Sequence, residues 1–417
     1  MTPRTLLHLS GLPWVFPFLL IAVALTWSTT FPVEPGYPLA AQVRASESMI
    51  LVYPVLALGA CVSARRLHIS GILDRPLGRS RFVAVSVGPA VLGGAALILA
   101  GVLQLVGAGG VGQFSWSLFG VAVAWASFST IFGSVVGRLG PLRGTAPLSV
   151  VVPYVLVGFP PAFDPPWLRH LFGLTSGCCR IDQVLDPRMV VSSLMLMLAL
   201  TLLVLAAGGS LTGHARLALG SSLVALVLGG LSVVTVDSLG YEATRARGGD
   251  PACRNLETTN VCVWPEHEAA LQDAIPAVEA VLAAAEDAGF VLPTRFVETS
   301  ETTSWPLVPL NVRSDLPSTA LAYSLASSIT PEPTSECLRR ISGDLDDDGA
   351  LLLYELRPVT TAWLMERANV GAAPIGPGPE ADKILAKLEG LEDGGEGILR
   401  QWQRDLISCE PPRTLVD

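Results

Sequence analysis

Long apolar stretches are the feature that most constrains how this 417-residue chain folds. A helix needs about 20 apolar residues to cross the ~30 Å hydrocarbon core of a bilayer. We find six clear stretches of this kind and a seventh, at residues 146–159, that is shorter and carries Pro147 and Pro153, so that it is expected to be kinked or re-entrant. The predicted spans run approximately over residues 13–30, 48–63, 82–106, 114–136, 146–159, 189–207 and 217–236.

Charge divides the chain into two parts. Residues 1–240 hold 13 basic and 7 acidic side chains, whereas residues 241–417 hold 14 basic and 29 acidic ones. With 50% apolar and 15% charged residues overall, this balance argues against a soluble enzyme, a nucleic-acid-binding protein and a disordered chain. The predicted fold class is therefore an α-helical polytopic membrane bundle over residues 1–240, followed by a small acidic α+β domain over residues 241–417.

Arginine placement predicts the orientation, because basic residues near span ends are retained on the cytoplasmic side. The loop over residues 64–81 carries five arginines and is the densest basic cluster, so we expect it to be cytoplasmic. Seven spans then place the amino terminus in the cytoplasm and the acidic domain outside the plasma membrane. If the short span did not cross, the acidic domain would lie inside. Trp14 and Trp27 bracket the first span, which we interpret as an uncleaved signal anchor.

The cysteines agree with an outer acidic domain, because disulfides persist in oxidising compartments. Six cysteines fall on the predicted outer side, and only Cys61 lies in a span. Six cysteines allow 15 complete pairing schemes. In one of them, bonds from 253 to 262 and from 337 to 409 would staple the domain and leave the adjacent pair for each other or for a partner. Free buried thiols are the alternative. The disulfide candidates are Cys178, Cys179, Cys253, Cys262, Cys337 and Cys409.

Several kinds of catalytic chemistry have no motif in this sequence. The only lysines are Lys383 and Lys387, and neither follows a glycine-rich phosphate loop. His267-Glu268 lacks the second histidine of a zinc-hydrolase helix. The spans carry no ionisable residue away from their edges, which disfavours an ion-coupled carrier. We therefore expect that the chain catalyses no reaction and binds no cofactor of its own. ATP would be used only through a partner subunit.

The cytoplasmic loop carries a more specific pattern. Its residues resemble the segment after the second span of type-2 ABC permeases, roughly A-R-R-E-x-x-S-G-T-L-x-x-L-x-x-x-P-x-x-R, which docks on an ATPase subunit as a short coupling helix. Leu67 stands where that family has an acid. The alternative is a basic loop that touches only lipid headgroups. The candidate coupling residues are Arg65, Arg66, Ile69, Ser70, Gly71, Ile72, Leu73, Arg75, Arg79 and Arg81.

This resemblance covers at most residues 1–210. It implies a permease-like subunit of an export complex, which forms a homo- or heterodimer and works with a separate cytoplasmic ATPase. The seventh span would carry the tail outward, as in permeases fused to extracytoplasmic domains that bind cargo or partners. The use of 25 arginines against two lysines fits an actinobacterial origin. The alternative function is a non-transporting membrane anchor that displays an extracytoplasmic binding or sensor domain.

The acidic domain is predicted to mix helices with a little strand. We expect a polar loop between Cys253 and Cys262, helices at 265–271 and 276–288 separated by Pro276, a strand at 295–299, and later helices at 318–328, 351–368, 381–391 and 397–408. This order is similar to the catalytic half of zinc aminopeptidases. Residues 320–327 supply no zinc ligand where that family has its zinc helix, which implies a non-catalytic remnant.

One motif in the acidic domain suggests a metal. Asp344, Asp346, Asp348 and Gly349, with Glu355 at the twelfth position, match the calcium-loop pattern D-x-[DN]-x-[DN]-G-x5-E. Acids at a helix start are also favoured without any metal, because they complement the helix dipole. The calcium-bound form would make the alternative function a calcium-responsive sensor.

Overall fold

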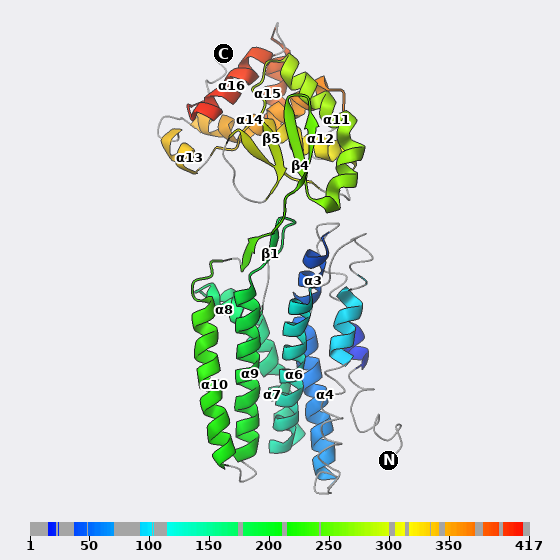
Figure 1. Ribbon diagram of the computed structural model, residues 1–417, viewed down its shortest axis with the longest axis vertical. Coiled ribbons are helices and arrows are strands. Elements are labelled where there is room, and N and C mark those ends of the chain that lie inside the picture. The colour runs from blue at the N-terminus through cyan, green and yellow to red at the C-terminus, as the bar shows by residue number, and fades with distance from the viewer. Residues whose placement is uncertain are drawn as a thin grey trace. The chain divides into compact units, whose positions relative to one another are not determined.

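The computed structural model (Figure 1) describes residues 16–21, 24, 37–47, 49–70, 92–101, 103, 115–173, 178–210, 215–241, 243–299, 305–312, 317–333, 335–341, 347–371, 378–391 and 395–411. The chain forms two compact units, Met1–Arg247 and Gly248–Asp417, called here the N-terminal and C-terminal units. The boundary lies after Arg247 rather than after residue 240, because strand β2 (Thr244–Ala246) pairs antiparallel with β1 (Gln183–Leu185) of the N-terminal unit.

Four helices in the described part of the N-terminal unit are long and apolar enough to cross a membrane. Each coincides with a predicted span, and α4 continues to Ile69, past the predicted end at residue 63. Two shorter apolar helices, Leu92–Gly101 and α7 (Leu142–Gly158), fall at two further predicted spans, and most of the first predicted span lies outside the described residues. The four long helices are α4 (Met49–Ile69), α6 (Trp116–Leu139), α9 (Pro187–Ser210) and α10 (Ala215–Val236).

Small residues bring α4 and α6 close together. A Cβ atom on Gly133 or Gly137 of α6 would overlap the backbone of Ala57 or Cys61 of α4, so the two backbones touch at these points. The helices are parallel, because the paired residue numbers rise together. Gly158, at the end of α7, lies against Ile50 near the start of α4, so α7 runs in the opposite direction.

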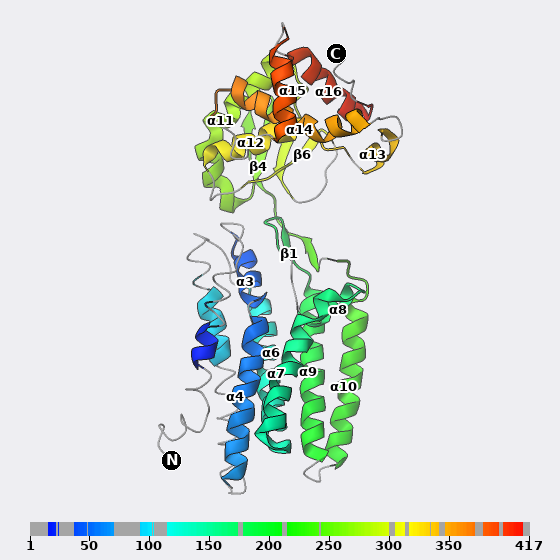
Figure 2. The ribbon, with the colours of Figure 1, turned by 180° about the vertical axis from the view of Figure 1, so that it is seen from behind.

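The helix directions define two ends of the N-terminal unit. Gly208 near the end of α9 lies against Val135 near the end of α6, so α4, α6 and α9 all finish at one end. Helices α7 and α10 begin there. The other end holds α3 (Pro38–Glu47), α8 (Trp167–Leu171) and the β1–β2 pair, as Figures 1 and 2 show from opposite sides. We call the first the basic end and the second the β1–β2 end.

The C-terminal unit is built on a four-stranded mixed sheet with the order β3-β4-β5-β6. Strands β3 (Ala252–Leu256) and β4 (Thr259–Val263) are antiparallel, whereas β4–β5 and β5–β6 are parallel, with β5 at Arg295–Glu298 and β6 at Leu307–Leu310. The other elements are η3 (Pro265–His267), α11 (Glu268–Asp287), α12 (Ser318–Ile329), α13 (Ser335–Ile341), α14 (Asp347–Arg367), α15 (Pro379–Glu389) and α16 (Glu396–Ser408). Helices with a small sheet agree with the expected α+β class.

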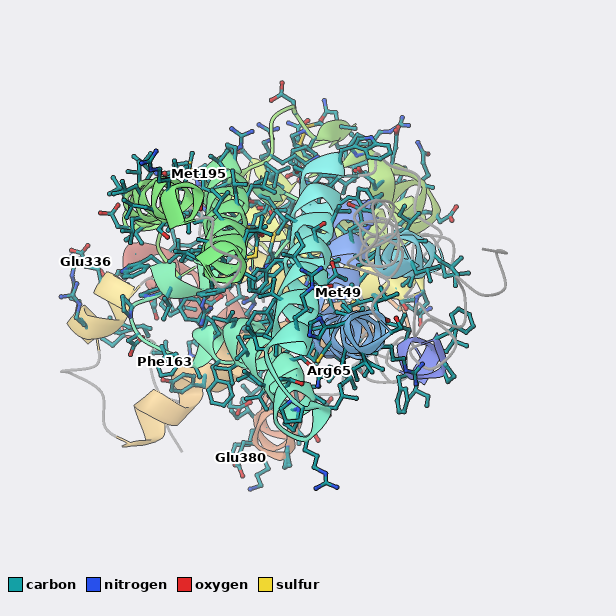
Figure 3. All side chains as sticks on the ribbon, turned by 90° about the horizontal axis from the view of Figure 1, so that it is seen from below. Met49, Arg65, Phe163, Met195, Glu336 and Glu380 are labelled. Carbon is teal, nitrogen blue, oxygen red and sulfur yellow. A yellow bond between two sulfur atoms is a disulfide. The ribbon has the colours of Figure 1, made fainter. Side chains whose placement is uncertain are left out.

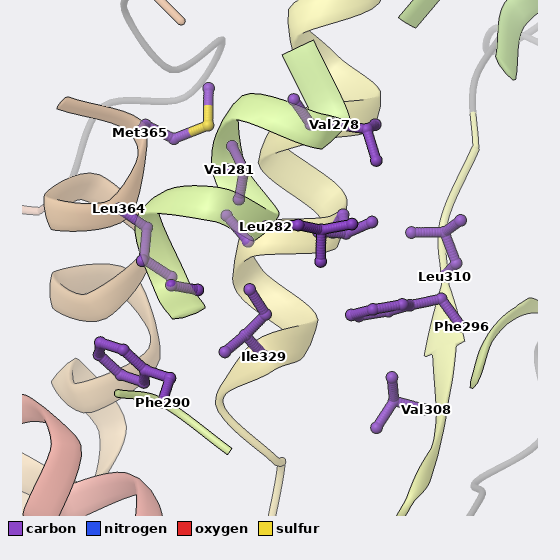
Figure 4. Close-up of a cluster of buried hydrophobic side chains, with 14 of the residues drawn as sticks. Val278, Val281, Leu282, Phe290, Phe296, Val308, Leu310, Ile329, Leu364 and Met365 are labelled. Atoms are coloured by element: carbon purple, nitrogen blue, oxygen red, sulfur yellow. The ribbon is translucent and has the colours of Figure 1, made fainter. Parts of the chain in front are cut away.

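The core of the C-terminal unit lies between the sheet and its helices. In Figure 4, Val278 and Leu282 of α11, Phe296 of β5, Leu310 of β6 and Ile329 of α12 converge on one apolar cluster. All five side chains are buried. Burying a side chain of this size contributes about 1.5–3 kcal/mol, so this cluster holds the helices on the sheet.

Two local predictions for this unit are wrong. The expected polar loop between Cys253 and Cys262 is the β3–β4 hairpin, whose two-residue turn is made possible by the left-handed backbone of Glu257 (φ 44°). The two helices expected on either side of Pro276 are the single helix α11. Pro276 is exposed, so the carbonyl that loses its helical hydrogen bond can bond to water instead.

Candidate functional site

The basic end of the N-terminal unit gathers arginines from four helices. Arg65 and Arg66 lie in the last turns of α4 and Arg138 in the last turn of α6, where positive charge is favoured by the helix dipole. Arg143 and Arg216 lie in the first turns of α7 and α10, which start at the same end. No acidic residue lies in the described turns at this end. Figure 3 shows the structure from below with Arg65 labelled.

The last turn of α4 presents charge and apolar surface together. Arg65 is partly exposed, Arg66 and His68 are exposed, and Ile69 is 70% exposed. Leu67 is 2% exposed and anchors the turn in the bundle, which explains why this position is apolar where the permease pattern has an acid. Among the residues that the structure describes, Arg65 and Arg66 make no ion pair. An exposed isoleucine beside unpaired arginines is a surface suited to an acidic partner with an apolar groove.

The predicted coupling residues are only in part described. Arg65, Arg66 and Ile69 lie on α4, and Ser70 follows it, donating its hydroxyl to the Leu67 carbonyl at 3.0 Å. They belong to a continuation of the span helix and not to a separate short helix. Outside the described residues lie Gly71, Ile72, Leu73, Arg75, Arg79 and Arg81.

The β1–β2 end carries charges of both signs, and three of its arginines contact neighbouring side chains. The Arg169 guanidinium lies 4.0 Å from the centre of the Tyr241 ring, and Arg247 stacks on Tyr37 at 5.2 Å. Asp186 accepts from the Arg188 guanidinium at 2.9 Å. The hydrogen bonds from Arg188 hold the pKa of Asp186 below its ordinary value. These contacts assign Arg169, Arg188 and Arg247 to structural roles.

His170 of α8 ties the segment after α10 to the bundle. Its Nε2–H donates to the Gly240 carbonyl at 2.8 Å, and its own carbonyl accepts from Ser193 of α9 at 2.9 Å. The ring is 1% exposed, and burial lowers the pKa of His170. A neutral imidazole in the Nε2–H form therefore suits this position.

The structure contains three disulfides between the six predicted cysteines. Cys253 pairs with Cys262 across the β3–β4 ladder, and Cys337 of α13 pairs with Cys409 at the end of α16. Cys178 pairs with its neighbour Cys179 in the N-terminal unit, and Cys61 is a free, buried thiol. Arg295 of β5 donates to both sulfurs of the hairpin disulfide, to Cys262 Sγ at 3.0 Å and Cys253 Sγ at 3.3 Å.

A buried carboxylate at the end of β5 is the main polar site of the C-terminal unit. Glu298 is 3% exposed and His267 is fully buried. The His267 Nδ1 and Glu298 Oε1 atoms lie 2.5 Å apart, and Glu298 Oε2 accepts from the Trp264 backbone N–H at 2.9 Å. The Trp264 indole donates to the Glu298 carbonyl at 3.1 Å. Burial raises the pKa of Glu298, and the hydrogen bond from His267 opposes that rise.

The pair formed by Glu298 and His267 was not predicted from the sequence. There, His267 stands out only as half of an incomplete zinc motif, and Glu298 only as part of a predicted strand. The two residues are 31 positions apart, and they meet because β4 and β5 are parallel neighbours whose ends lie side by side. The one available signal in the sequence was a glutamate at an inward-facing position of the predicted strand. Residues of β5 alternate between partly exposed and buried, and Glu298 takes a buried position.

The calcium-loop pattern does not form a loop where the structure describes it. Helix α14 begins at Asp347, so Asp348 and Glu355 lie seven residues apart on one continuous helix, an axial separation of about 10 Å. Asp344 and Asp346 lie outside the described residues, and among the described ones no cluster of three or more metal-ligating side chains occurs.

Residues 261–383 match a family described as a domain of unknown function (DUF7224). The match covers less than half of the chain and includes β5, α11, α12 and the Glu298–His267 pair. No curated protein and no solved structure matches the chain.

Proposed function

We propose that this chain is a permease-like membrane subunit of an ABC export complex that works with a separate cytoplasmic ATPase and hydrolyses no nucleotide itself. The observation that carries the proposal is the end of α4, where Arg65, Arg66 and the 70% exposed Ile69 form a surface without a partner among the described residues. A rigid helix ending in such a surface can transmit a partner's movement into the bundle, because α4 is packed tightly on α6.

The distribution of charge supports the orientation in this proposal. The basic end has arginines and no acid in its described turns, whereas the segments at the β1–β2 end mix arginines with four acids, Asp164, Asp182, Asp186 and Asp237. By sequence, the loop that leaves α4 adds three arginines, Arg75, Arg79 and Arg81, against one acid, Asp74. The positive-inside rule then assigns the basic end to the cytoplasm.

The direction of α10 supports an extracytoplasmic C-terminal unit. Helix α10 starts at the basic end and finishes at the β1–β2 end, so the chain leaves the bundle on the side away from the cytoplasm. Seven spans, with α7 as the fifth, account for this arrangement. The disulfides in the C-terminal unit suit an oxidising compartment. There the C-terminal unit would bind cargo or a partner protein.

The direct test is purification of the full chain from its native membranes in mild detergent, followed by mass spectrometry of the proteins that come with it. We expect an ATPase with a phosphate-binding loop to co-purify, and Arg65→Glu with Arg66→Glu to reduce its recovery about tenfold or more, the factor that corresponds to ~1.4 kcal/mol. The matched control is Arg339→Glu with Arg340→Glu, an adjacent exposed pair in α13, which should leave recovery unchanged. Absence of any such ATPase, or equal recovery with both variants, would rule the proposal out.

A further inference from the structure

The sheet of the C-terminal unit places one guanidinium beside one disulfide. Cys253 and Cys262 pair directly across the β3–β4 ladder, and Asn260 of β4 lies opposite Arg295 of β5. Because alternate residues of a strand share a face of the sheet, Cys262 and Arg295 lie on the same face. Phe296, the next residue of β5, belongs to the core cluster on the other face. The disulfide and its arginine are therefore on the side of the sheet that the core does not occupy.

Arg295 donates two hydrogen bonds to this disulfide. Its Nε–H donates to Cys262 Sγ at 3.0 Å, and a terminal N–H donates to Cys253 Sγ at 3.3 Å. Among the residues that the structure describes, Arg295 pairs with no carboxylate. The sulfur of a disulfide is neutral and a weak acceptor, whereas hydrogen bonds to an ionised acceptor are about twice as strong as neutral ones. The same contacts would therefore strengthen if the S–S bond were broken to give a thiolate.

The two sulfurs differ in their access to solvent. Cys253 lies on β3 at the edge of the sheet and is exposed, whereas Cys262 on β4 is 0% exposed. An incoming thiolate can therefore reach Cys253, and the sulfur of Cys262 becomes the leaving group. A leaving thiolate that is stabilised departs faster, and a buried anion needs a charged partner. Arg295, at 3.0 Å, is that partner.

The hairpin provides for re-formation of the bond. Its ladder runs from Ala252, opposite Val263, to Leu256, opposite Thr259. These backbone pairs lie on both sides of the disulfide, so they hold Cys253 opposite Cys262 after the S–S bond breaks. Reduction at this place is therefore a reversible change within a strand pair that persists.

We propose that the Cys253–Cys262 disulfide is a thiol–disulfide exchange site for a dithiol reductant, with Arg295 stabilising the leaving thiolate. One thiolate of the reductant bonds to Cys253 Sγ, the S–S bond breaks, and its electron pair leaves on Cys262 Sγ. The second thiolate of the reductant then attacks the first, which closes a disulfide in the reductant and releases the Cys253 thiolate. Two electrons pass from the dithiol to the cysteines, and its two protons pass through solvent to the released sulfurs. This chemistry needs neither an ATPase nor transport, so it stands apart from the function proposed above.

The test measures the reduction of the full-length protein in detergent by dithiothreitol at a fixed pH. Samples are quenched with acid, unfolded and alkylated, and peptide mass spectrometry then quantifies reduced Cys253 and Cys262. We expect Arg295→Gln to lower the second-order rate constant of reduction about tenfold, because the leaving thiolate loses its charged partner. Arg295→Lys keeps the charge and should lie closer to the wild type.

Arg254→Gln is the matched control. It removes the same charge from the residue next to Cys253, but Arg254 lies on the other face of β3 and pairs with Glu268 of α11 at 3.7 Å. Its rate constant should stay within about twofold of the wild-type value, because an exposed charge on the far face is screened by salt. An unchanged rate constant in Arg295→Gln, or an equal decrease in Arg254→Gln, would overturn the proposal.

The wild-type protein gives a second measurement that does not depend on any variant. Reduced glutathione carries a single thiol, so its first attack leaves a mixed disulfide that mass spectrometry locates after acid quenching. We expect glutathione on the exposed Cys253. Glutathione on Cys262 instead, or on the two cysteines equally, would overturn the proposal even if Arg295→Gln failed to fold.

Discussion

Glu298, among the described residues of the C-terminal unit, is a buried carboxyl group with a shifted pKa. Its carboxyl group lies at the edge of the core, where it forms hydrogen bonds with the His267 ring and the Trp264 backbone N–H. Because burial raises the pKa of Glu298, the folded protein keeps this proton at pH values where the unfolded chain has lost it. Its contribution to stability is therefore fully present below the unfolded pKa and declines as the pH rises toward the folded pKa.

Glu298→Gln should remove this pH dependence, because a glutamine side chain has nearly the same size as glutamate but cannot ionise. We expect the free energy of unfolding of the variant, relative to wild type, to increase as the pH is raised from about 4 to 7. Denaturant unfolding of the full chain in detergent, followed by tryptophan fluorescence at several pH values, measures this. A difference that decreases with pH would show that ionisation of Glu298 stabilises the fold.

At the scale of elements, the close contact of α4 with α6 depends on two glycines. A Cβ on Gly133 would overlap the Ala57 carbonyl, and one on Gly137 would overlap that of Cys61, so any larger residue pushes the helices apart. Because these carbonyls are backbone atoms, a side-chain rotation cannot relieve the overlap. The same contact positions the end of α4, and with it Arg65 and Arg66.

Gly133→Ala should therefore destabilise the bundle by about 1–3 kcal/mol, the usual range for overpacking. Gly120→Ala is the matched control, because it lies on the same helix and nothing stands within 4 Å of its added Cβ. Thermal unfolding in detergent should show a lower midpoint for the first variant only. Equal midpoints would show that α4 and α6 are not in close contact.

The disulfides of the C-terminal unit differ in the length of chain that they close. Cys337 and Cys409 are 72 residues apart and join α13 to the end of α16, whereas Cys253 and Cys262 are 9 apart within one hairpin. Chain entropy assigns about 4 kcal/mol to the longer loop and less to the shorter one. Cys337→Ser with Cys409→Ser should thus lower the unfolding midpoint more than Cys253→Ser with Cys262→Ser. The reverse order would contradict the entropic account.

The apolar helices could be predicted because the length of an apolar run is a local property, and α6, α9 and α10 lie at predicted spans. The β3–β4 hairpin was missed because Arg254, Asn255 and Asn260 are polar and exposed, so the strands look like a loop in sequence. Pro276 suggested a break between two helices, but at an exposed position a helix can continue through a proline, as α11 does. The Glu298–His267 contact depends on strand pairing, which no local pattern encodes.

At the scale of the whole molecule, the account depends on which side of the membrane each region occupies. The basic end carries the surface proposed for the ATPase, and the C-terminal unit carries two disulfides. Both assignments follow from the directions of α4 and α10 together with the positive-inside rule. A reversed protein would present its disulfides to a reducing compartment and its arginines to the exterior.

Cysteine accessibility in intact cells tests this arrangement most directly. The native cysteines are in disulfides except Cys61, which is buried, so an introduced thiol is the one available to a membrane-impermeant maleimide. Thr258→Cys lies in the exposed turn of the β3–β4 hairpin, and Ser70→Cys is exposed after α4. We predict that Thr258→Cys is labelled in intact cells and Ser70→Cys only after permeabilisation. Labelling of Ser70→Cys in intact cells, with Thr258→Cys protected, would contradict the account.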